Sequence, residues 1–361
     1  MQVTDSLDAG GMERVAVNIA NSLPLEAYVS HICTTRREGQ LASAIAPHVR
    51  RLNLARRSTV DPAAVARLAA YCREERIAIL HAHASSLFIA ALAAAIVPRV
   101  KLIWHDHYGA HETHERPAFV YRMGATQVDG VIAVSRPLAE WSVRRLGVPI
   151  SRVRYIPNFV ALPGGADRAP DLPGVPGGRI LCVANLRPQK DHLNLIRAMH
   201  IVAGECSSAH LILLGVADDA GHLERIRREI ADMGLSERVT WLGSRDDVHA
   251  VMRACDVGVL SSASEGLPLA LIEYGMARLA SVATSVGQCA EVLDGGRAGV
   301  LVPPRSPEAL ARALTALLRS AEERQALGAR LEEHVRREYS AASAMERITA
   351  FYDEVLRGSP L

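Results

Sequence analysis

Short apolar runs alternate with amphipathic stretches throughout the second half of the chain. The runs are four to six residues long, which suits buried strands. Helical periodicity fills the gaps and is clearest over residues 191–203 and 223–233. This alternation predicts a parallel sheet with helices on both faces. The expected strands are residues 179–184, 210–215, 239–242, 257–260, 280–283 and 299–302.

The first half repeats the pattern, with expected strands at residues 1–4, 28–33, 77–81, 101–104 and 130–134. Residues 163–178 are rich in Gly and Pro and are typical of a linker. The sequence therefore predicts an α/β protein of two doubly wound, Rossmann-like domains facing a central cleft that binds a ligand. The expected parts are a first domain (1–162), the linker (163–178), a second domain (179–340) and a C-terminal helix (341–361) that crosses back to the first domain.

Composition agrees with a globular protein of this size. The chain has 361 residues, of which 49% are apolar and 22% charged, enough for two domains with their own cores. Six cysteines are scattered singly without a CxxC pair, so we expect reduced, packed thiols and a cytoplasmic protein. The longest apolar run, residues 87–98, is too short to span a bilayer. The chain opens directly on a strand, so its natural start is expected a few residues upstream.

Charge is divided unevenly although the net charge is only +2. Residues 1–160 carry an excess of +6, whereas the remainder carries −4. A basic first half favours an anionic partner there. Nucleic acid is not expected, because only 4% of residues are aromatic and no base-reading motif is present.

A pair of glycines, Gly10 and Gly11, follows the first strand and precedes a helical pattern. Adjacent glycines let backbone N–H groups approach an anion at a helix N-terminus. The motif is not GxGxxG, so a nicotinamide-binding fingerprint is not supported. A simple tight loop is the alternative interpretation.

Two cations, Arg187 and Lys190, stand in the loop after the first strand of the second domain. Spaced three residues apart at the carboxyl end of a strand, they can clamp a diphosphate. The alternative is a solvated loop with two ordinary surface charges.

Six histidines gather after two strands of the first domain, in LHAHASS and IWHDHYGAHETH. Each HxH pair projects two rings to one side of a strand, which raises a metal site as one hypothesis. Carboxylates at metal-site spacing are scarce beyond Asp106, and the pairs Asp218-Asp219 and Asp246-Asp247 are adjacent instead of forming DxD. We therefore expect no metal. The six residues are His81, His83, His105, His107, His111 and His114.

The stretch SSASEGLPLALIEYGM places two carboxylates, Glu265 and Glu273, eight positions apart. Pro268 suits the first turn of a helix, predicted over residues 268–278. On that helix Glu273 shares a stripe with Leu269, Ile272 and Met276 and so is expected to face the core side. Such a carboxylate needs partners, either a ligand or a buried arginine. Loop amides ahead of the helix offer donors for an anion.

Taken together, these motifs resemble those of the retaining glycosyltransferases of family 4, which have the two-domain GT-B fold. The resemblance covers nearly the whole chain, and its most specific part is the Glu-x7-Glu motif of Glu265 and Glu273. It implies that Glu273 binds the ribose of a nucleotide sugar and that Glu265 faces the sugar ring. It also implies that the diphosphate is bound by Arg187, Lys190, the amides of Gly10 and Gly11, and the loop residues Gly266, Leu267, Pro268 and Leu269.

The resemblance extends to the base and to the first domain. Ser244 and Arg245 would seat the base, and the first-domain histidine of the family maps onto His107, with His105 as the alternative. Gln288 stands where the family usually has a glycine, which affects the contacts of that loop. Catalysis would retain the anomeric configuration and need neither a metal nor another cofactor. The catalytic residues would be Arg187, Lys190, Glu265 and His107.

The donor sugar, its base, the acceptor and the oligomeric state remain open. Arginines in VRRLNLARR and the Arg144-Arg145 pair favour an anionic membrane surface and a sugar- or lipid-linked acceptor of polysaccharide or glycolipid synthesis. The protein would then be peripheral at the inner face of the plasma membrane. A small soluble acceptor is the alternative, and a sugar-nucleotide epimerase, a metallohydrolase and a silent binder are weaker ones. The arginines of the first cluster are Arg50, Arg51, Arg56 and Arg57.

Overall fold

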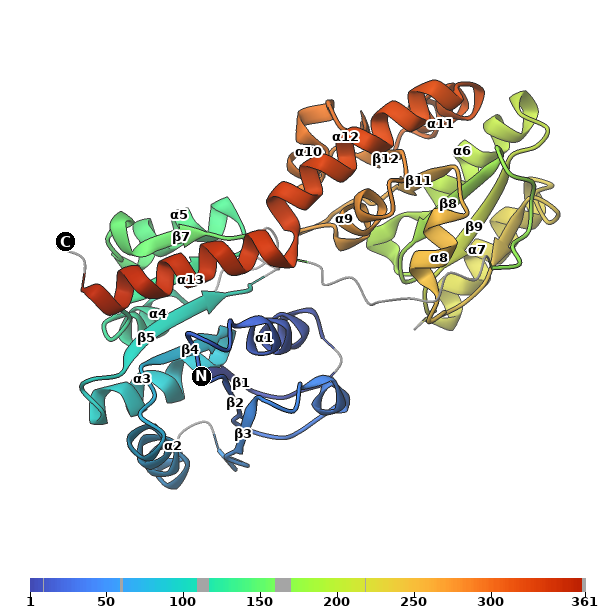
Figure 1. The fold of residues 1–361 in the computed structure, drawn as a ribbon. Coiled ribbons are helices and arrows are strands. Elements are labelled where there is room, and N and C mark those ends of the chain that lie inside the picture. The colour runs from blue at the N-terminus through green and yellow to red at the C-terminus, as the bar shows by residue number, and fades with distance from the viewer. Residues whose placement is uncertain (9, 59–60, 109–116, 160–169, 218, 359–361) are drawn as a thin grey trace. The chain divides into compact units, whose positions relative to one another are not determined.

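The computed structural model describes residues 1–8, 10–58, 61–108, 117–159, 170–217 and 219–358, and shows two compact units (Figure 1). Unit 1 comprises Met1–Phe159 together with Ala341–Leu361, and unit 2 is Val160–Ser340. The predicted linker lies partly outside the described residues, at 163–169. All six cysteines are free.

Unit 1 is built on a parallel sheet of seven strands in the order β3-β2-β1-β4-β5-β6-β7. The strands all run in the same direction, but the order in which they are added to the sheet reverses between β1 and β4. The loops after these two strands therefore diverge there. The strands are β1 (Gln2–Thr4), β2 (His31–Thr34), β3 (Arg50–Asn53), β4 (Ile79–His83), β5 (Lys101–Asp106), β6 (Gly130–Ala133) and β7 (Val153–Tyr155).

Helices cover both faces of this sheet. Apolar side chains of one face pack with α2, α3 and α5, and those of the other pack with α1 and α13. On the second face α13 approaches β6 at Gly130, where a Cβ atom would collide with the ring of Phe351. The helices are α1 (Gly11–Ser22), α2 (Pro62–Glu74), α3 (Leu87–Ile96), α4 (Ala118–Ala125), α5 (Arg136–Leu146) and α13 (Ala341–Arg357).

Unit 2 has a parallel sheet of six strands in the order β10-β9-β8-β11-β12-β13. Its reversal point lies between β8 and β11. The strands are β8 (Arg179–Val183), β9 (His210–Leu214), β10 (Val239–Trp241), β11 (Val257–Leu260), β12 (Ser281–Thr284) and β13 (Val300–Val302).

The helices of unit 2 also cover both faces. Side chains of α6, α7 and α11 pack on one face, and those of α8, α9, α10 and α12 on the other. The helices are α6 (His192–Glu205), α7 (Ala220–Asp232), α8 (Val248–Arg253), α9 (Leu269–Met276), α10 (Cys289–Val292), α11 (Pro307–Arg319) and α12 (Ala321–Tyr339). The predicted fold class, two doubly wound α/β domains, is confirmed.

Several predicted boundaries are wrong in unit 1. The second strand starts at His31 instead of residue 28, and the third predicted strand runs to His83 instead of ending at residue 81. Strands β3 and β7 were not predicted at all. Both are edge strands, and the side chains of β3 are mostly exposed and charged, so no apolar run marks them.

Candidate functional site

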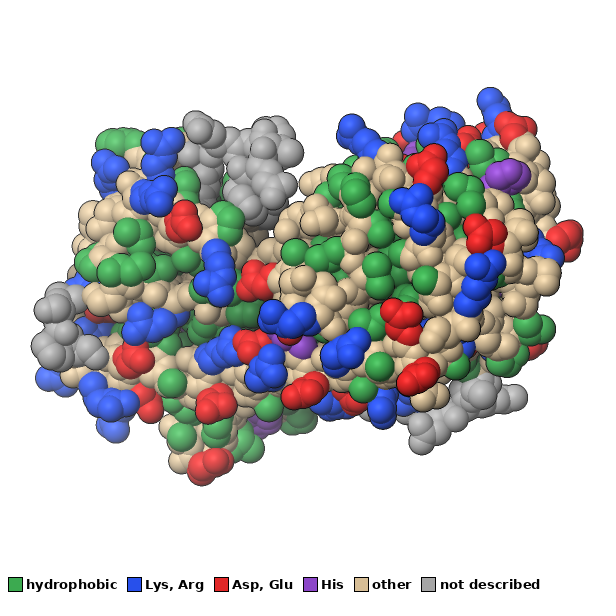
Figure 2. Space-filling model, turned by 90° about the horizontal axis from the view of Figure 1, so that it is seen from above, with side chains coloured by type: hydrophobic (Ala, Val, Ile, Leu, Met, Phe, Trp, Pro, Cys, Tyr) green, Lys and Arg blue, Asp and Glu red, His purple; other side chains and the backbone are tan. Residues whose placement is uncertain are grey.

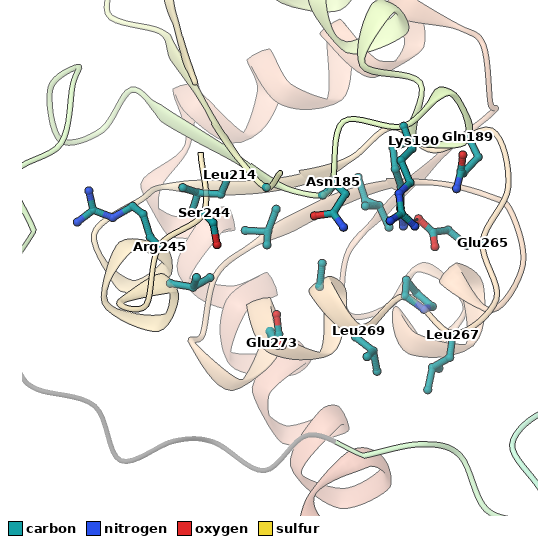
Figure 3. A pocket seen from close by; sticks show the side chains of 18 of the residues that line it. Asn185, Gln189, Lys190, Leu214, Ser244, Arg245, Glu265, Leu267, Leu269 and Glu273 are labelled. Atoms are coloured by element: carbon teal, nitrogen blue, oxygen red, sulfur yellow. Dashed lines mark hydrogen bonds and ion pairs between the residues drawn. The ribbon is translucent and has the colours of Figure 1, made fainter. Parts of the chain in front are cut away.

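A pocket lies at the reversal point of the unit 2 sheet, where the loops after β8 and β11 diverge (Figure 3). Such points at the carboxyl ends of parallel strands are where doubly wound folds bind ligands. The pocket has a volume of about 510 Å³. Its wall is completed by the ends of β9 and β10 and by the first turns of α9.

Most of the residues predicted to bind the donor line this one pocket. Lys190 and Glu265 lie at one end in the view of Figure 3, and Ser244 and Arg245 lie at the other. Gly266 belongs to the same loop, whereas Gly10, Gly11, His105 and His107 belong to unit 1. The predicted residues in the lining are Arg187, Lys190, Ser244, Arg245, Glu265, Leu267, Pro268, Leu269 and Glu273.

The two loops are joined by an ion pair. Lys190 Nζ lies 2.6 Å from Glu265 Oε1, and the Glu265 side chain is only 7% exposed. Ser262 Oγ donates a second hydrogen bond to the same oxygen, also at 2.6 Å. The amide of Ala263 donates to the carbonyl of Gln189, which ties the loops by their backbones as well. Glu265 and Lys190 are therefore held together before any ligand binds.

Glu273 reaches the pocket because the next residue anchors α9 to the sheet. Tyr274 is fully buried, its hydroxyl accepts a hydrogen bond from the amide of Val183, and its ring occupies the space beside Gly258. Burial raises the pKa of Tyr274 well above its usual value, so the phenol stays protonated. The half-buried Glu273 side chain then points into the pocket from α9.

The predicted orientation of α9 is therefore wrong in part. The helix covers Leu269–Met276 instead of 268–278, and Pro268 stands at its N-cap. Ile272 and Met276 are buried as predicted, but Leu269 is 37% exposed. Glu273 thus faces the pocket at the edge of the buried stripe and not the core.

The Glu265 loop is supported by a neighbouring loop through Gly287. This glycine has φ +50°, and a Cβ atom there would run into the backbone carbonyl of Glu265. The amide of Gln288 donates to the carbonyl of Gly266 at 3.1 Å. Gln288 thus contacts the site loop through its backbone N–H, which any residue except proline can provide.

Arg245 is held by a bidentate ion pair with Asp247, with distances of 2.7 and 2.6 Å from Nε and Nη2. Its guanidinium is therefore fixed at the edge of the pocket. The adjacent Ser244 side chain points inward in Figure 3.

Sequence reasoning missed Asn185, Gln189 and Leu214, which also line the pocket. Asn185 Oδ1 accepts a hydrogen bond from the amide of Val216, which joins the loops after β8 and β9. A polar residue directly after a buried strand was the available signal, because the carboxyl ends of β8 and β9 are neighbours in the sheet.

In unit 1 the predicted glycine turn does open a helix. Gly10 is the N-cap residue of α1, and the helix begins at Gly11. A Cβ atom would meet nothing within 4 Å at Gly11 but would collide with the Glu13 carboxylate at Gly10. Neither glycine has a positive φ.

Four of the predicted histidines form one cluster, of which His81 and His83 lie on β4, His105 lies on β5 and the partly exposed His107 follows β5. His81 Nε2 lies 3.1 Å from His105 Nδ1, and His83 Nδ1 lies 3.0 Å from His107 Nε2. Burial lowers the pKa of His107 to about 3 and those of the other three well below the usual value. All four rings are thus neutral at physiological pH. His111 and His114 lie outside the described residues.

Three of these rings are close enough for a metal to be considered. One nitrogen atom each of His81, His83 and His105 lies within 4.8 Å of the others, and all three residues are buried. Imidazole nitrogen is a common ligand of Zn²⁺. This cluster is where a metal would bind in the described part of unit 1.

Arg56 was predicted to belong to a basic surface, and this is wrong. Its side chain is 3% exposed, and Nη2 lies 2.7 Å from Asp5 Oδ1 at the end of β1. Although burial alone would raise it, the pKa of Asp5 is lowered by hydrogen bonds from Thr35 and Ser85 and by the charge of Arg56. Arg50 and Arg51 are on the surface but pair with Glu75 and Glu38.

Family models match most of the chain. The model for "Glycosyltransferase Family 4" matches residues 9–162, and that for "Glycosyl transferases group 1" matches residues 177–320. The chain belongs to the group 1 glycosyltransferases. It is therefore a glycosyltransferase of two Rossmann-like domains.

Individual relatives agree. The phosphatidyl-myo-inositol mannosyltransferase of Mycobacterium leprae is 30% identical over 82% of this chain and 78% of its own length. The lipopolysaccharide core biosynthesis mannosyltransferase LpcC of Rhizobium leguminosarum is 25% identical over 60% of this chain and 67% of its own length. The Anabaena protein HepE, solved in complex with UDP, superimposes with a TM-score of 0.79 at 19% identity, covering 98% of this chain and 99% of HepE. The similarity between this chain and HepE supports the GT-B fold.

Among the residues that the structure describes, we find no helix that is both long enough and apolar enough to cross a bilayer.

Proposed function

We propose that the protein is a retaining glycosyltransferase that moves a sugar from a nucleoside-diphosphate sugar to an acceptor hydroxyl without a metal ion. The observation that carries this proposal is the unit 2 pocket, which gathers three cationic side chains and two carboxylates at the reversal point of a parallel sheet. A nucleotide sugar presents the matching groups: a diphosphate for the cations and hydroxyls for the carboxylates.

The pocket divides into parts that match the donor. Arg187, Lys190 and the loop amides of residues 266–269 would bind the diphosphate, and Glu265 the sugar. Glu273 would accept hydrogen bonds from the ribose hydroxyls, with Ser244 and Arg245 beside the base. HepE, which shares the fold, is solved with UDP and with UDP-glucose, which supports a uridine nucleotide here.

Transfer requires stabilisation of the leaving diphosphate, because breaking the anomeric C–O bond leaves negative charge on it. Positioned cations and amides supply that stabilisation at low cost in reorganisation. Glu265 is already paired with Lys190 and so is a poor covalent nucleophile. We therefore infer that the acceptor hydroxyl attacks on the face that the diphosphate leaves, giving its proton to a phosphate oxygen, which retains the configuration.

Two substitutions test the division of the pocket. Glu273→Gln should mainly weaken nucleotide affinity, whereas Glu265→Ala should mainly lower kcat with the donor bound. Affinity can be read from thermal shifts with UDP-, GDP- and ADP-sugars, since a ligand at 100 times its Kd stabilises the protein by about 2.7 kcal/mol. If Glu273→Gln lowers the Tm but leaves nucleotide affinity unchanged, Glu273 is a structural residue. If none of the three nucleotide sugars shifts the Tm, the donor class is wrong.

Metal independence needs its own test because of the histidine cluster. Activity should persist in EDTA, and metal analysis of the purified protein should show less than one equivalent. Activity that is lost in EDTA and restored by one added metal would contradict the proposal.

We further propose a lipid-linked acceptor reached at an anionic membrane surface. Two relatives are named for transfer to phosphatidyl-myo-inositol and to the lipopolysaccharide core. Helix α4 offers a surface for this: Phe119 is 73% and Met123 64% exposed. Arg122 of the same helix donates to the carbonyl of Arg145 on α5, so the apolar side chains lie beside basic ones.

This surface replaces the predicted one in VRRLNLARR, where Arg50 and Arg51 are paired with carboxylates, Arg56 is buried and Arg57 alone is exposed without an ion pair to a described residue. On the face that Figure 2 shows, Lys and Arg alternate with Asp and Glu. The protein should sediment with phosphatidylglycerol vesicles at low salt, and Phe119→Ser with Met123→Ser should abolish this. Arg50→Ala serves as the control. If the wild type stays in the supernatant, a small soluble acceptor is favoured.

A further inference from the structure

One face of the unit 1 sheet carries a row of buried polar side chains across the ends of three neighbouring strands. Gln2 lies on β1, His81 and His83 on β4, and His105 on β5, with His107 just after it. All except His107 are at most 2% exposed. Tyr352 of α13 reaches the same row from the covering helix. Hydrogen bonds connect all of these side chains into one network, which we call the hydrogen-bond chain.

The amide of Gln2 gives this chain its direction. Gln2 Nε2 donates to the hydroxyl of Tyr352 at 3.1 Å, so the other end of the amide, Oε1, is an acceptor. His83 Nε2 lies 2.9 Å from that oxygen and must therefore carry the proton.

The orientation of the His83 hydrogen bonds in turn fixes that of His107. A neutral imidazole has one N–H, so His83 Nδ1 is bare and accepts a hydrogen bond. Its partner at 3.0 Å is His107 Nε2, which must carry the proton of that ring. His107 Nδ1 is therefore left as an acceptor.

A second branch of these hydrogen bonds, from Tyr352 through His81 to His105, does not include His107. The Tyr352 hydroxyl donates to His81 Nδ1 at 2.5 Å, and His81 Nε2 then donates to His105 Nδ1. The two branches meet only at Gln2 and Tyr352. His81 thus shares the stacking and burial of His83, with ring centroids 4.7 Å apart, but not its bond to His107.

Two buried acceptors end the first branch. Neither His107 Nδ1 nor Asn158 Oδ1 has a partner with full hydrogen-bond geometry among the described residues. The Asn158 side chain nevertheless acts on His107 as a hydrogen-bonding group that raises its pKa, an effect smaller than that of burial, which lowers it. A buried acceptor without a donor is costly, and a hydroxyl group of a ligand would satisfy it.

We propose that Gln2 and His83 are positioning residues that hold His107 in its neutral Nε2–H tautomer, so that Nδ1 accepts a hydrogen bond from a substrate hydroxyl. The role of His107 toward substrate rests on the proposed function, whereas its tautomer does not. The same geometry disfavours a metal on His81, His83 and His105, because Nε2 of His81 and of His83 each carries a proton engaged in the chain.

Substitutions at His83 and His81 separate positioning from packing. His83→Leu should lower kcat/KM about tenfold, the worth of a buried hydrogen bond of about 1.4 kcal/mol. His83→Asn should retain activity within about threefold, because its Oδ1 takes the place of Nδ1 and accepts from His107. His81→Asn is the matched control, expected within about twofold of the wild type. Equal losses at His81 and His83 would overturn the proposal.

The tautomer can be measured without any assay of transfer. Imidazole ¹⁵N–¹H correlation spectra of histidine-labelled protein, assigned by a His107→Gln variant, distinguish protonated from bare nitrogens. We expect a protonated Nε2 and a bare Nδ1 for His107 in the wild type and in His83→Asn, and exchange between tautomers in Gln2→Met. A protonated Nδ1 in the wild type overturns the proposal, even if the protein transfers sugar. The expected tautomer in a protein that transfers no sugar would contradict the proposed function alone.

Discussion

Lowering the pH from 7.5 to 5.0 should destabilise unit 1, because four histidines are held there in the neutral form. The pKa of His107 falls to about 3 in the folded state, against 6.5 for the free side chain. The unfolded chain therefore takes up the proton first as the pH falls. The stability that this histidine contributes is fully present above pH 6.5 and is lost progressively below it.

The size of the loss follows from the distance to pH 6.5. At pH 5.0 a histidine that stays neutral in the folded state costs about 2 kcal/mol, since 1.5 pH units correspond to 1.36 kcal/mol each. His81, His83 and His105 shift in the same direction, so each adds to the loss. A typical domain is stable by about 5–15 kcal/mol, so the loss at His107 alone is a large part of the stability of unit 1.

Urea unfolding followed by tryptophan fluorescence measures this loss. A Trp241→Phe background leaves Trp104 and Trp141, both in unit 1, as the reporters. His31 and His192 shift in the same direction, so the wild-type loss alone does not isolate the cluster. His81→Asn removes one ring of the cluster and should reduce the pH-dependent loss by about 2 kcal/mol. The same loss in both proteins would refute the reasoning.

Three other predictions concern Lys190, Gly287 and Arg56. Lys190→Met should lower kcat about a hundredfold with the fold intact, and near-normal turnover would exclude it from the diphosphate site. Gly287→Ala should weaken nucleotide binding about tenfold by displacing the Glu265 loop, whereas Gly295→Ala, which has a similar φ of +65° but open space around it, should cost only stability. Arg56→Met should cost about 1–3 kcal/mol in urea unfolding, because Asp5, whose side chain is 20% exposed, loses its ion-pair partner but keeps the hydrogen bonds from Thr35 and Ser85, and adding Asp5→Asn should recover much of it.

The strands of unit 2 could be predicted to within one residue at each end because their residues are mostly apolar and shielded from solvent. Residues 257–260, for example, are fully apolar and form β11 as predicted. The edge strand β3 could not be found, because Arg50 and Arg51 stand where an alternation of apolar residues would mark a strand. The pattern of apolar residues therefore shows which strands are buried, and does not detect an exposed strand.

The unit 2 pocket was largely predictable because its residues follow strands that are neighbours in the sheet. Glu265 and Lys190 come from the loops after β11 and β8, which the topology alone brings together. The partner of Arg56 was not predictable, because Asp5 is 51 residues away and only the folded chain shows their contact. The tautomers of the histidines depend on one amide, Gln2, whose orientation is not recorded in any local pattern.

The place of α13 in unit 1 has a consequence for synthesis of the protein on the ribosome. Ile79, Ile103 and Ile132 of the unit 1 sheet pack against α13, whose residues are translated after the whole of unit 2. Unit 2 is complete in sequence before that helix emerges, so it can fold first, although unit 1 begins the chain. Until then, an apolar face of unit 1 stays uncovered and prone to association, which makes the nascent chain a natural client for chaperones.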